Sequence, residues 1–274
     1  MRILASKVTL CSFSYPMRSI MRVKLAAVAT AAAFVTAFTP GVAQADHSWN
    51  NYHWARASNP FTLKLGDNVD SKWDSHLRTT STDWTKSSVV DTPVTAGGTK
   101  PRSCRGTSGR VEVCNAAYGS AGWLGIASIS ITSGSHITQG TVKLNDTYFN
   151  TAKYNTPAWR NVVSCQEVGH TLGLDHQDEN FDNADLGTCM DYSNNPVPNQ
   201  HPNAHDYTML EKIYAHLDAT TTVSATAPTK GGGKPGNTPD SWGKLVSGSR
   251  AAGQSTYVRN LGSGNKVVTF VTWA

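Results

Sequence analysis

The sequence predicts an α+β fold, because strand-like and helix-like segments both occur between residues 61 and 217. Hydrophobic residues make up 39% of the chain, which is sufficient for a core, while charged residues make up only 16%. These fractions exclude a highly charged disordered chain, a collagen repeat and a coiled coil. The length of 274 residues allows one large domain or two small ones.

Alternation of apolar and polar side chains marks the expected strands. The first lies at 61–65, and further strands are expected at 89–94, 111–113 and 126–131. The segment 140–150 has apolar side chains on one face and polar side chains on the other. This pattern is typical of an edge strand with one face exposed to water.

Helical spacing marks three further segments. Trp73, Leu77 and Trp84 predict a helix within 70–86, and a late helix is expected over 206–217. Between these two, a third helix has clear boundary signals. Its cap is Thr156, the next residue is a proline that suits a first helical turn, and a glycine at 173 can end it.

The first 45 residues are typical of a secretory signal peptide. A basic stretch at 21–24 precedes the apolar run 25–38, and the small-residue site Ala43-Gln44-Ala45 follows. The apolar run is too short to span a bilayer, so we expect a secreted, extracellular protein without a membrane span after cleavage before Asp46. The segment 1–45 also carries the whole positive excess of the chain, so nucleic-acid binding is not expected.

Composition divides the chain into four parts. After the signal-peptide region 1–45 we expect a main domain at 46–218 and a linker at 219–240, which is rich in Thr, Ala, Pro and Gly. Two strand-like runs then predict a small β-hairpin extension at 241–274.

Charge is distributed unevenly along the chain. Residues 161–218 contain ten acidic residues and one basic residue, whereas residues 219–274 contain six basic residues and one acidic residue. Because opposite charges attract, we expect the basic tail from Lys230 to Lys266 to dock on or near the acidic segment.

Four cysteines remain after the signal peptide, namely Cys104, Cys114, Cys165 and Cys189. An even number in an exported chain predicts two disulfides, with three possible connectivities. A Cys104–Cys114 bond is favoured because it closes a short loop.

The stretch 165–176 carries the pattern H-E-x-x-H-x-x-G-x-x-H of zinc proteases, with one departure. Glu167, His170, Gly173 and His176 fall in register, and Gln166 stands at the first histidine position. Positions 166 and 170 face the same way from one helix. Gly173 allows the chain to leave the helix in a left-handed conformation, which can return His176 to the same metal ion.

A methionine and a tyrosine follow this motif at short distances along the chain. Met190 lies fourteen residues after His176, and Tyr192 follows two residues later. With these motifs the chain resembles the metzincin superfamily of zinc endopeptidases, most closely its matrixin-like members of secreted bacterial type. The resemblance implies a metzincin (zincin-like) catalytic domain with a twisted mixed sheet, a catalytic helix and a Met-turn beneath the metal.

The resemblance also implies an activity. Zn²⁺ would be held by His170, His176 and Gln166, and Glu167 would act as general base on a metal-bound water that attacks a peptide bond. Tyr192 would hydrogen-bond the developing oxyanion. The expected partner is a protein or peptide substrate, bound to the edge strand at 140–150 by strand addition, and the expected state is a monomer.

The same resemblance implies a disulfide between Cys165 and Cys189, since the catalytic helix and the Met-turn lie close together in that family. An alternative function remains, because a Gln oxygen is a weaker metal ligand than imidazole. In that case the chain is a catalytically silent, secreted binding protein of the same fold.

Other polar side chains are weaker candidates. The loop after His176 could bind Ca²⁺ through oxygen ligands, but it lacks EF-hand spacing, so a solvated loop is expected. Three other histidines, His136, His201 and His205, are expected to be surface, turn or loop residues. The loop candidates for Ca²⁺ are Asp178, Glu179, Asp182, Asn183 and Asp185.

Overall fold

The computed structural model describes residues 46–225 and 236–274. The predicted signal peptide and the middle of the predicted linker lie outside these residues. Among the described residues, no helix combines the length and the apolar character needed to cross a membrane.

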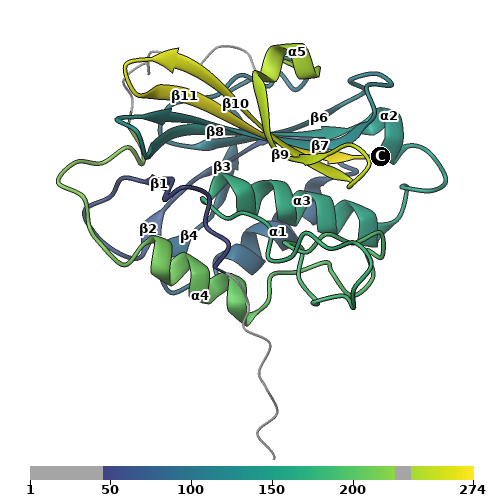
Figure 1. Cartoon of the computed structure of the whole chain (residues 1–274), viewed down its shortest axis with the longest axis horizontal. Helices are drawn as coiled ribbons and strands as arrows, with labels where there is room; N and C mark the ends of the chain where they lie inside the picture. The colour runs from purple at the N-terminus through teal and green to yellow at the C-terminus, as the bar shows by residue number, and fades with distance from the viewer. Residues whose placement is uncertain (1–45, 226–235) are drawn as a thin grey trace, which may run out of the picture. The chain divides into compact units, whose positions relative to one another are not determined.

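A mixed sheet of nine strands dominates the structure, which confirms the predicted α+β class (Figure 1). Its order is β5-β3-β6-β8-β7-β11-β10-β9, and β1 pairs with the start of β8. A second sheet contains only β2 and β4. The strands are β1 (His53–Trp54), β2 (Phe61–Thr62), β3 (Leu65–Asn68), β4 (Val90–Asp91), β5 (Val94–Ala96), β6 (Val111–Ala116), β7 (Trp123–Thr132), β8 (His136–Asn145), β9 (Lys244–Ser249), β10 (Gln254–Gly262) and β11 (Asn265–Trp273).

Helices cover both faces of the main sheet. Figure 1 shows α1, α3 and α4 below the sheet and α5 above it. Helix α3 packs against β7, β8 and β11, and α1 packs against α3. The helices are α1 (Asp74–Trp84), α2 (Asp146–Phe149), α3 (Pro157–Thr171), α4 (Ala204–Ile213) and α5 (Pro239–Trp242).

The boundary signals of α3 act as predicted. The Thr156 hydroxyl accepts a hydrogen bond from the Trp159 backbone N–H at 3.2 Å, and Pro157 occupies the first helical position. Gly173 follows the helix with φ of 99°, and a Cβ there would collide with the Tyr52 carbonyl oxygen. Glycine is therefore needed at the point where the chain turns back from α3.

The prediction of an edge strand at 140–150 is wrong. Strand β8 lies inside the sheet, where it pairs with β6 on one side and β7 on the other, and the chain enters α2 at Asp146. The alternation of polar and apolar residues led to this wrong prediction because the polar face of β8 is also covered by other parts of the chain. Lys143 is buried there, and its Nζ donates to the Asn237 Oδ1 at 2.7 Å. The polar side chains of β8 therefore face a polar interior contact and not water.

The C-terminal strands continue the main sheet. The predicted hairpin is present as β10 and β11, β9 adds a third strand, and β11 pairs antiparallel with β7. Alternation along β11 buries both of its faces. Val268 and Phe270 join the main core beneath the sheet, and Val271 and Trp273 join a second apolar cluster with Trp242 of α5. We refer to β9, β10 and β11 together as the C-terminal strands.

Two disulfides are present, and both predicted pairings are confirmed. Cys104 is bonded to Cys114, and Cys165 of α3 is bonded to Cys189. The second bond fixes α3 to the segment that carries Met190 and Tyr192. Two disulfides are compatible with an extracellular location.

Candidate active site

The structure brings the five predicted site residues together. Gln166, Glu167 and His170 are buried side chains of α3, and the turn after the helix returns His176 to them. His170 Nε2 lies 3.0 Å from His176 Nε2. The ring of Tyr192 lies 4.2 Å from the ring of His176, centroid to centroid.

The two histidines are arranged as metal ligands are. The Nδ1 atom of His170 lies 2.9 Å from the Leu174 carbonyl oxygen, which can only accept, so Nδ1 carries the proton and Nε2 has a free lone pair. The Nδ1 atom of His176 lies 3.3 Å from Asp175 Oδ1 but has no hydrogen-bond partner, so its tautomer is not fixed. The two Nε2 atoms lie 3.0 Å apart, a distance that fits either a hydrogen bond between the rings or a shared metal ion.

Burial keeps both imidazoles neutral. Burial, with a smaller contribution from the neighbouring His176, lowers the pKa of His170 to about 3. Burial also lowers the pKa of His176 to about 3. Since a metal ion binds only the unprotonated ring nitrogen, these values fit the proposed ligand role across the neutral pH range.

Met190 supports the helix turn that carries His170. Its side chain is fully buried, and a Cβ on Gly169 would collide with the Met190 sulfur and with the Trp84 ring. Trp84 in turn donates from Nε1 to the Cys165 carbonyl oxygen at 3.1 Å. The absence of a side chain at Gly169 therefore allows α1, α3 and Met190 to pack closely behind the histidines.

Gln166 is held by hydrogen bonds at both ends of its amide. Its Nε2 donates to the Cys189 carbonyl oxygen at 2.8 Å. Its Oε1 accepts from Gln254 Nε2 and Thr272 Oγ1, each at 2.9 Å. Both lone pairs of this oxygen are therefore engaged by the C-terminal strands, so in this arrangement it is not free to bind a metal ion.

Glu167 has a raised pKa in the same network. Burial raises the pKa of its carboxyl to about 8, although a hydrogen bond with Thr272 opposes the rise. Thr272 Oγ1 lies 2.6 Å from Glu167 Oε1 and 2.9 Å from Gln166 Oε1 but has only one hydrogen to donate. A protonated Glu167 that donates to Thr272, which then donates to Gln166, accounts for both contacts of the Thr272 hydroxyl, while Glu167 Oε2 stays buried without a hydrogen-bond partner.

Phe270 completes the cover over the histidines. Its ring stacks on the His170 ring with a centroid distance of 4.3 Å and an interplanar angle of 5°. We call Gln254, Phe270 and Thr272 the covering residues. Sequence reasoning missed all three, since they lie about 80 to 110 positions from the motif they contact and belong to no known spacing pattern.

A pocket of about 460 Å³ opens beside the covering residues. Its lining includes Gln254, Thr272, Phe181 and Asn194. Arg250 also lines this pocket, and its guanidinium lies 5.2 Å from the centroid of the Trp273 ring. The pocket reaches two of the three covering residues from the surface.

The predicted docking of the tail on residues 161–218 is confirmed for the described part of the tail. The contacts are those of the covering residues, together with Ser247 and Glu179, whose side-chain oxygens lie 3.5 Å apart. The ion pairs found within 46–225 and 236–274 include none between the two segments. The C-terminal strands are therefore held on residues 161–218 by hydrogen bonds and ring stacking, and not by ion pairs.

The other candidates lie apart from this site. Asp178 accepts hydrogen bonds from Asn180 and Asn183, whereas Asp185 accepts from Ser193. These loop acids thus have separate partners, and Ca²⁺ binding stays a prediction. His201 Nδ1 lies 2.6 Å from Asp83 Oδ2, the His205 ring stacks on that of His47, and His136 lies beside Asp218.

No protein-family model matches the chain, and a search among curated proteins gives no match either.

Proposed function

We propose that the chain is a secreted zinc-dependent endopeptidase of metzincin type whose active site is covered by its own C-terminal strands. The observation that carries the proposal is the buried pair of imidazole Nε2 atoms, His170 and His176, which lie 3.0 Å apart, with Glu167 one helical turn before His170. Two neutral imidazoles supply two of the three protein ligands of a catalytic zinc site.

His170 and His176 would hold the zinc ion. Gln166 supplies the third donor once its oxygen is released from Gln254 and Thr272. A bound zinc ion supplies Lewis acidity, which makes water a nucleophile near neutral pH and polarises the peptide carbonyl.

Residues of the chain transfer the proton of the attacking water and stabilise the negative charge of the oxyanion. Glu167 takes the proton of the attacking water and passes it to the leaving amine. Tyr192, whose ring packs on that of His176, donates a hydrogen bond to the oxyanion. Met190 and the Cys165–Cys189 bond keep the ligands in position.

Strand β7 takes the role that was expected of the segment 140–150. It is the strand beside the site, and a peptide added to it antiparallel would run past Glu167. Strand β11 already fills this position from Lys266, opposite Ile131, to Trp273, opposite Trp123. A peptide substrate therefore has to displace β11.

Displacement also changes the chemistry of Glu167. Burial under β11 holds the carboxyl protonated near neutral pH, a form that cannot accept a proton. Water entering the opened site would lower its pKa toward the ordinary value and generate the base. The covered form is therefore inactive for two reasons, blocked access and a neutral Glu167.

The test is the double substitution Phe270→Ala/Thr272→Ala, which removes the contacts of β11 with His170 and Glu167. We expect zinc-loaded variant protein to hydrolyse casein or a quenched peptide library at least about tenfold faster than wild type. Adding Glu167→Gln to the same background is the matched control and should abolish the gain. Circular dichroism verifies that the variants are folded. Zinc-loaded, folded double variant without hydrolysis would contradict the proposal.

The second candidate function is a catalytically silent binding protein. The observation in its favour is that Gln166 is fully engaged in hydrogen bonds that fix the cover and does not face a vacant ligand position. This candidate predicts that the double variant is inactive and that adding Gln166→His creates zinc-dependent hydrolysis. Activity without that third substitution excludes it.

A further inference from the structure

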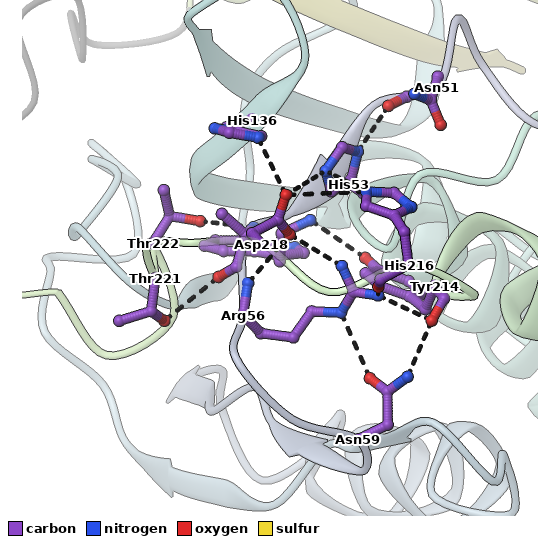
Figure 2. Close-up of polar contacts among 12 residues, drawn as sticks. Asn51, His53, Arg56, Asn59, His136, Tyr214, His216, Asp218, Thr221 and Thr222 are labelled. Atoms are coloured by element: carbon purple, nitrogen blue, oxygen red, sulfur yellow. Dashed lines mark hydrogen bonds and ion pairs between the residues drawn. The ribbon is translucent and has the colours of Figure 1, made fainter.

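A second cluster of histidines lies away from the candidate active site. His53 of β1, His136 at the start of β8, and His216 and Asp218 after α4 point toward one another (Figure 2). The ligand atoms of His53, His216 and Asp218 all lie within 4.8 Å of one another, whereas His136 is not part of this group. Two imidazoles and one carboxylate form a set of three zinc ligands.

The distances among these atoms match a tetrahedral ion. His53 Nε2 lies 3.1 Å from His216 Nε2 and 3.4 Å from Asp218 Oδ1. Asp218 Oδ1 lies 3.3 Å from His136 Nε2 and 3.7 Å from His216 Nε2. Ligands about 2.0 to 2.1 Å from a tetrahedral zinc ion are separated from one another by about 3.4 Å. The atoms of His53, His216 and Asp218 are thus spaced as ligands of one ion.

Neighbouring groups orient two of the ligands. His53 Nδ1 lies 2.7 Å from the Asn51 carbonyl oxygen, so Nδ1 donates and Nε2 presents its lone pair to the cluster. The other oxygen of Asp218, Oδ2, accepts from Arg56 Nη1 at 2.9 Å and from the Arg56 backbone N–H at 3.2 Å. These contacts leave Oδ1 for the cluster, as expected of hydrogen bonds that position metal ligands.

The facing acceptors need a positive charge. With its proton on Nδ1, His53 directs a lone pair at the anionic oxygen of Asp218. A cation placed between the two atoms turns this repulsion into attraction. Exposure rises from 2% at His53 and 10% at Asp218 to 26% at His136 and 46% at His216, so an ion can enter from the side of His216.

We propose that His53, His216 and Asp218 bind one Zn²⁺ ion that acts as a clasp. The protein supplies three ligands, and water would fill the fourth position. The ion joins the N-terminal segment to the chain after α4. The site goes beyond the proposed peptidase function and does not depend on it.

The test compares bound zinc in full-length variants. Wild type, His216→Ala and Asp218→Asn are stripped with chelator, equilibrated with Zn²⁺, desalted and analysed by mass spectrometry for zinc per chain. We expect each variant to hold one zinc fewer than wild type. His201→Ala, which removes an exposed histidine elsewhere, is the matched control and should hold as much as wild type.

A second measurement separates this site from the candidate active site. Zinc should raise the melting temperature of His170→Ala, which retains the clasp, and the rise should be lost when His216→Ala is added. Equal zinc contents in wild type, His216→Ala and Asp218→Asn would overturn the proposal, and they would show that the three groups form only a proton-linked network. Circular dichroism verifies that each variant is folded. Because the His216 side chain is half-exposed, its replacement does not leave a cavity in the core.

Discussion

Glu167 is the residue in which structure and proposed chemistry are most closely linked. Its carboxyl is fully buried among α3, β7 and β11, and a Cβ on Gly125 of β7 would collide with it. Burial without a compensating cation raises its pKa to about 8. A group that must ionise in order to act as a base is therefore held neutral by the covering strand.

This raised pKa predicts a pH-dependent stability. Between the unfolded value of 4.5 and the folded value of about 8, the unfolded chain loses this proton while the folded chain keeps it. Folding stability from this group therefore falls as pH rises, by up to about 1.4 kcal/mol per pH unit. With chelator present, urea unfolding from pH 5 to pH 8 should show this fall in wild type relative to Glu167→Gln.

The comparison isolates one group, because the buried histidines titrate in both proteins. Their lowered pKa values act on the acid side, where stability falls as pH drops below about 6.5. Stability curves of wild type and Glu167→Gln that stay parallel between pH 5 and pH 8 would show that Glu167 is ionised in the folded protein.

At the scale of elements, the Cys165–Cys189 bond fixes α3 to the segment that carries Met190. The two residues are separated by 24 positions, and each directly precedes a residue of the site, Gln166 or Met190. The link thus restrains both the helix and the turn beneath the histidines. A centre that binds metal benefits from such restraint because its ligands need no ordering upon binding.

Removing this bond should lower stability. Closing a loop of this length in the unfolded chain stabilises the fold by about 3 kcal/mol in the loop-entropy model. We expect Cys165→Ala/Cys189→Ala to lose about that much unfolding free energy in urea and to bind zinc less tightly. The paired control is Cys104→Ala/Cys114→Ala, whose bond closes a shorter loop away from the site; an equal loss of zinc affinity in both would contradict the positioning role.

The sequence predicts the elements whose signals are local. The cap at Thr156, the turn at Gly173 and the motif from Gln166 to His176 all lie within one short stretch, so helix α3 and its ligands follow from residue spacing. The position of β11 in the sheet cannot be predicted in this way, because β11 pairs with residues of β7 that are more than 130 positions away. Alternation of apolar and polar residues indicates a strand but does not indicate which strand it pairs with. The wrong edge strand and the missed covering residues have this common cause.

Non-local assembly also hid the histidine clasp. His53 is separated from Asp218 by 165 positions and from His216 by 163. No ligand spacing could reveal such a set, whereas the active-site pair needed only six positions between its histidines. Sequence motifs therefore located the candidate active site and left the second cluster to be found in the structure.

At the scale of the whole molecule, the C-terminal strands extend the main sheet of the described chain. Strand β11 buries apolar side chains on both faces, and its polar Thr272 contacts Glu167 and Gln166. The same strand therefore supports the core and covers the proposed site. A peptidase built in this way is controlled by whatever loosens β11 from β7.

The central claim is that a zinc ion lies between the two active-site histidines. It is tested most directly by anomalous diffraction at the zinc absorption edge from crystals of the full-length protein equilibrated with Zn²⁺. We predict an anomalous peak about 2.1 Å from both His170 Nε2 and His176 Nε2. Saturating zinc with no peak between these two atoms would contradict the account.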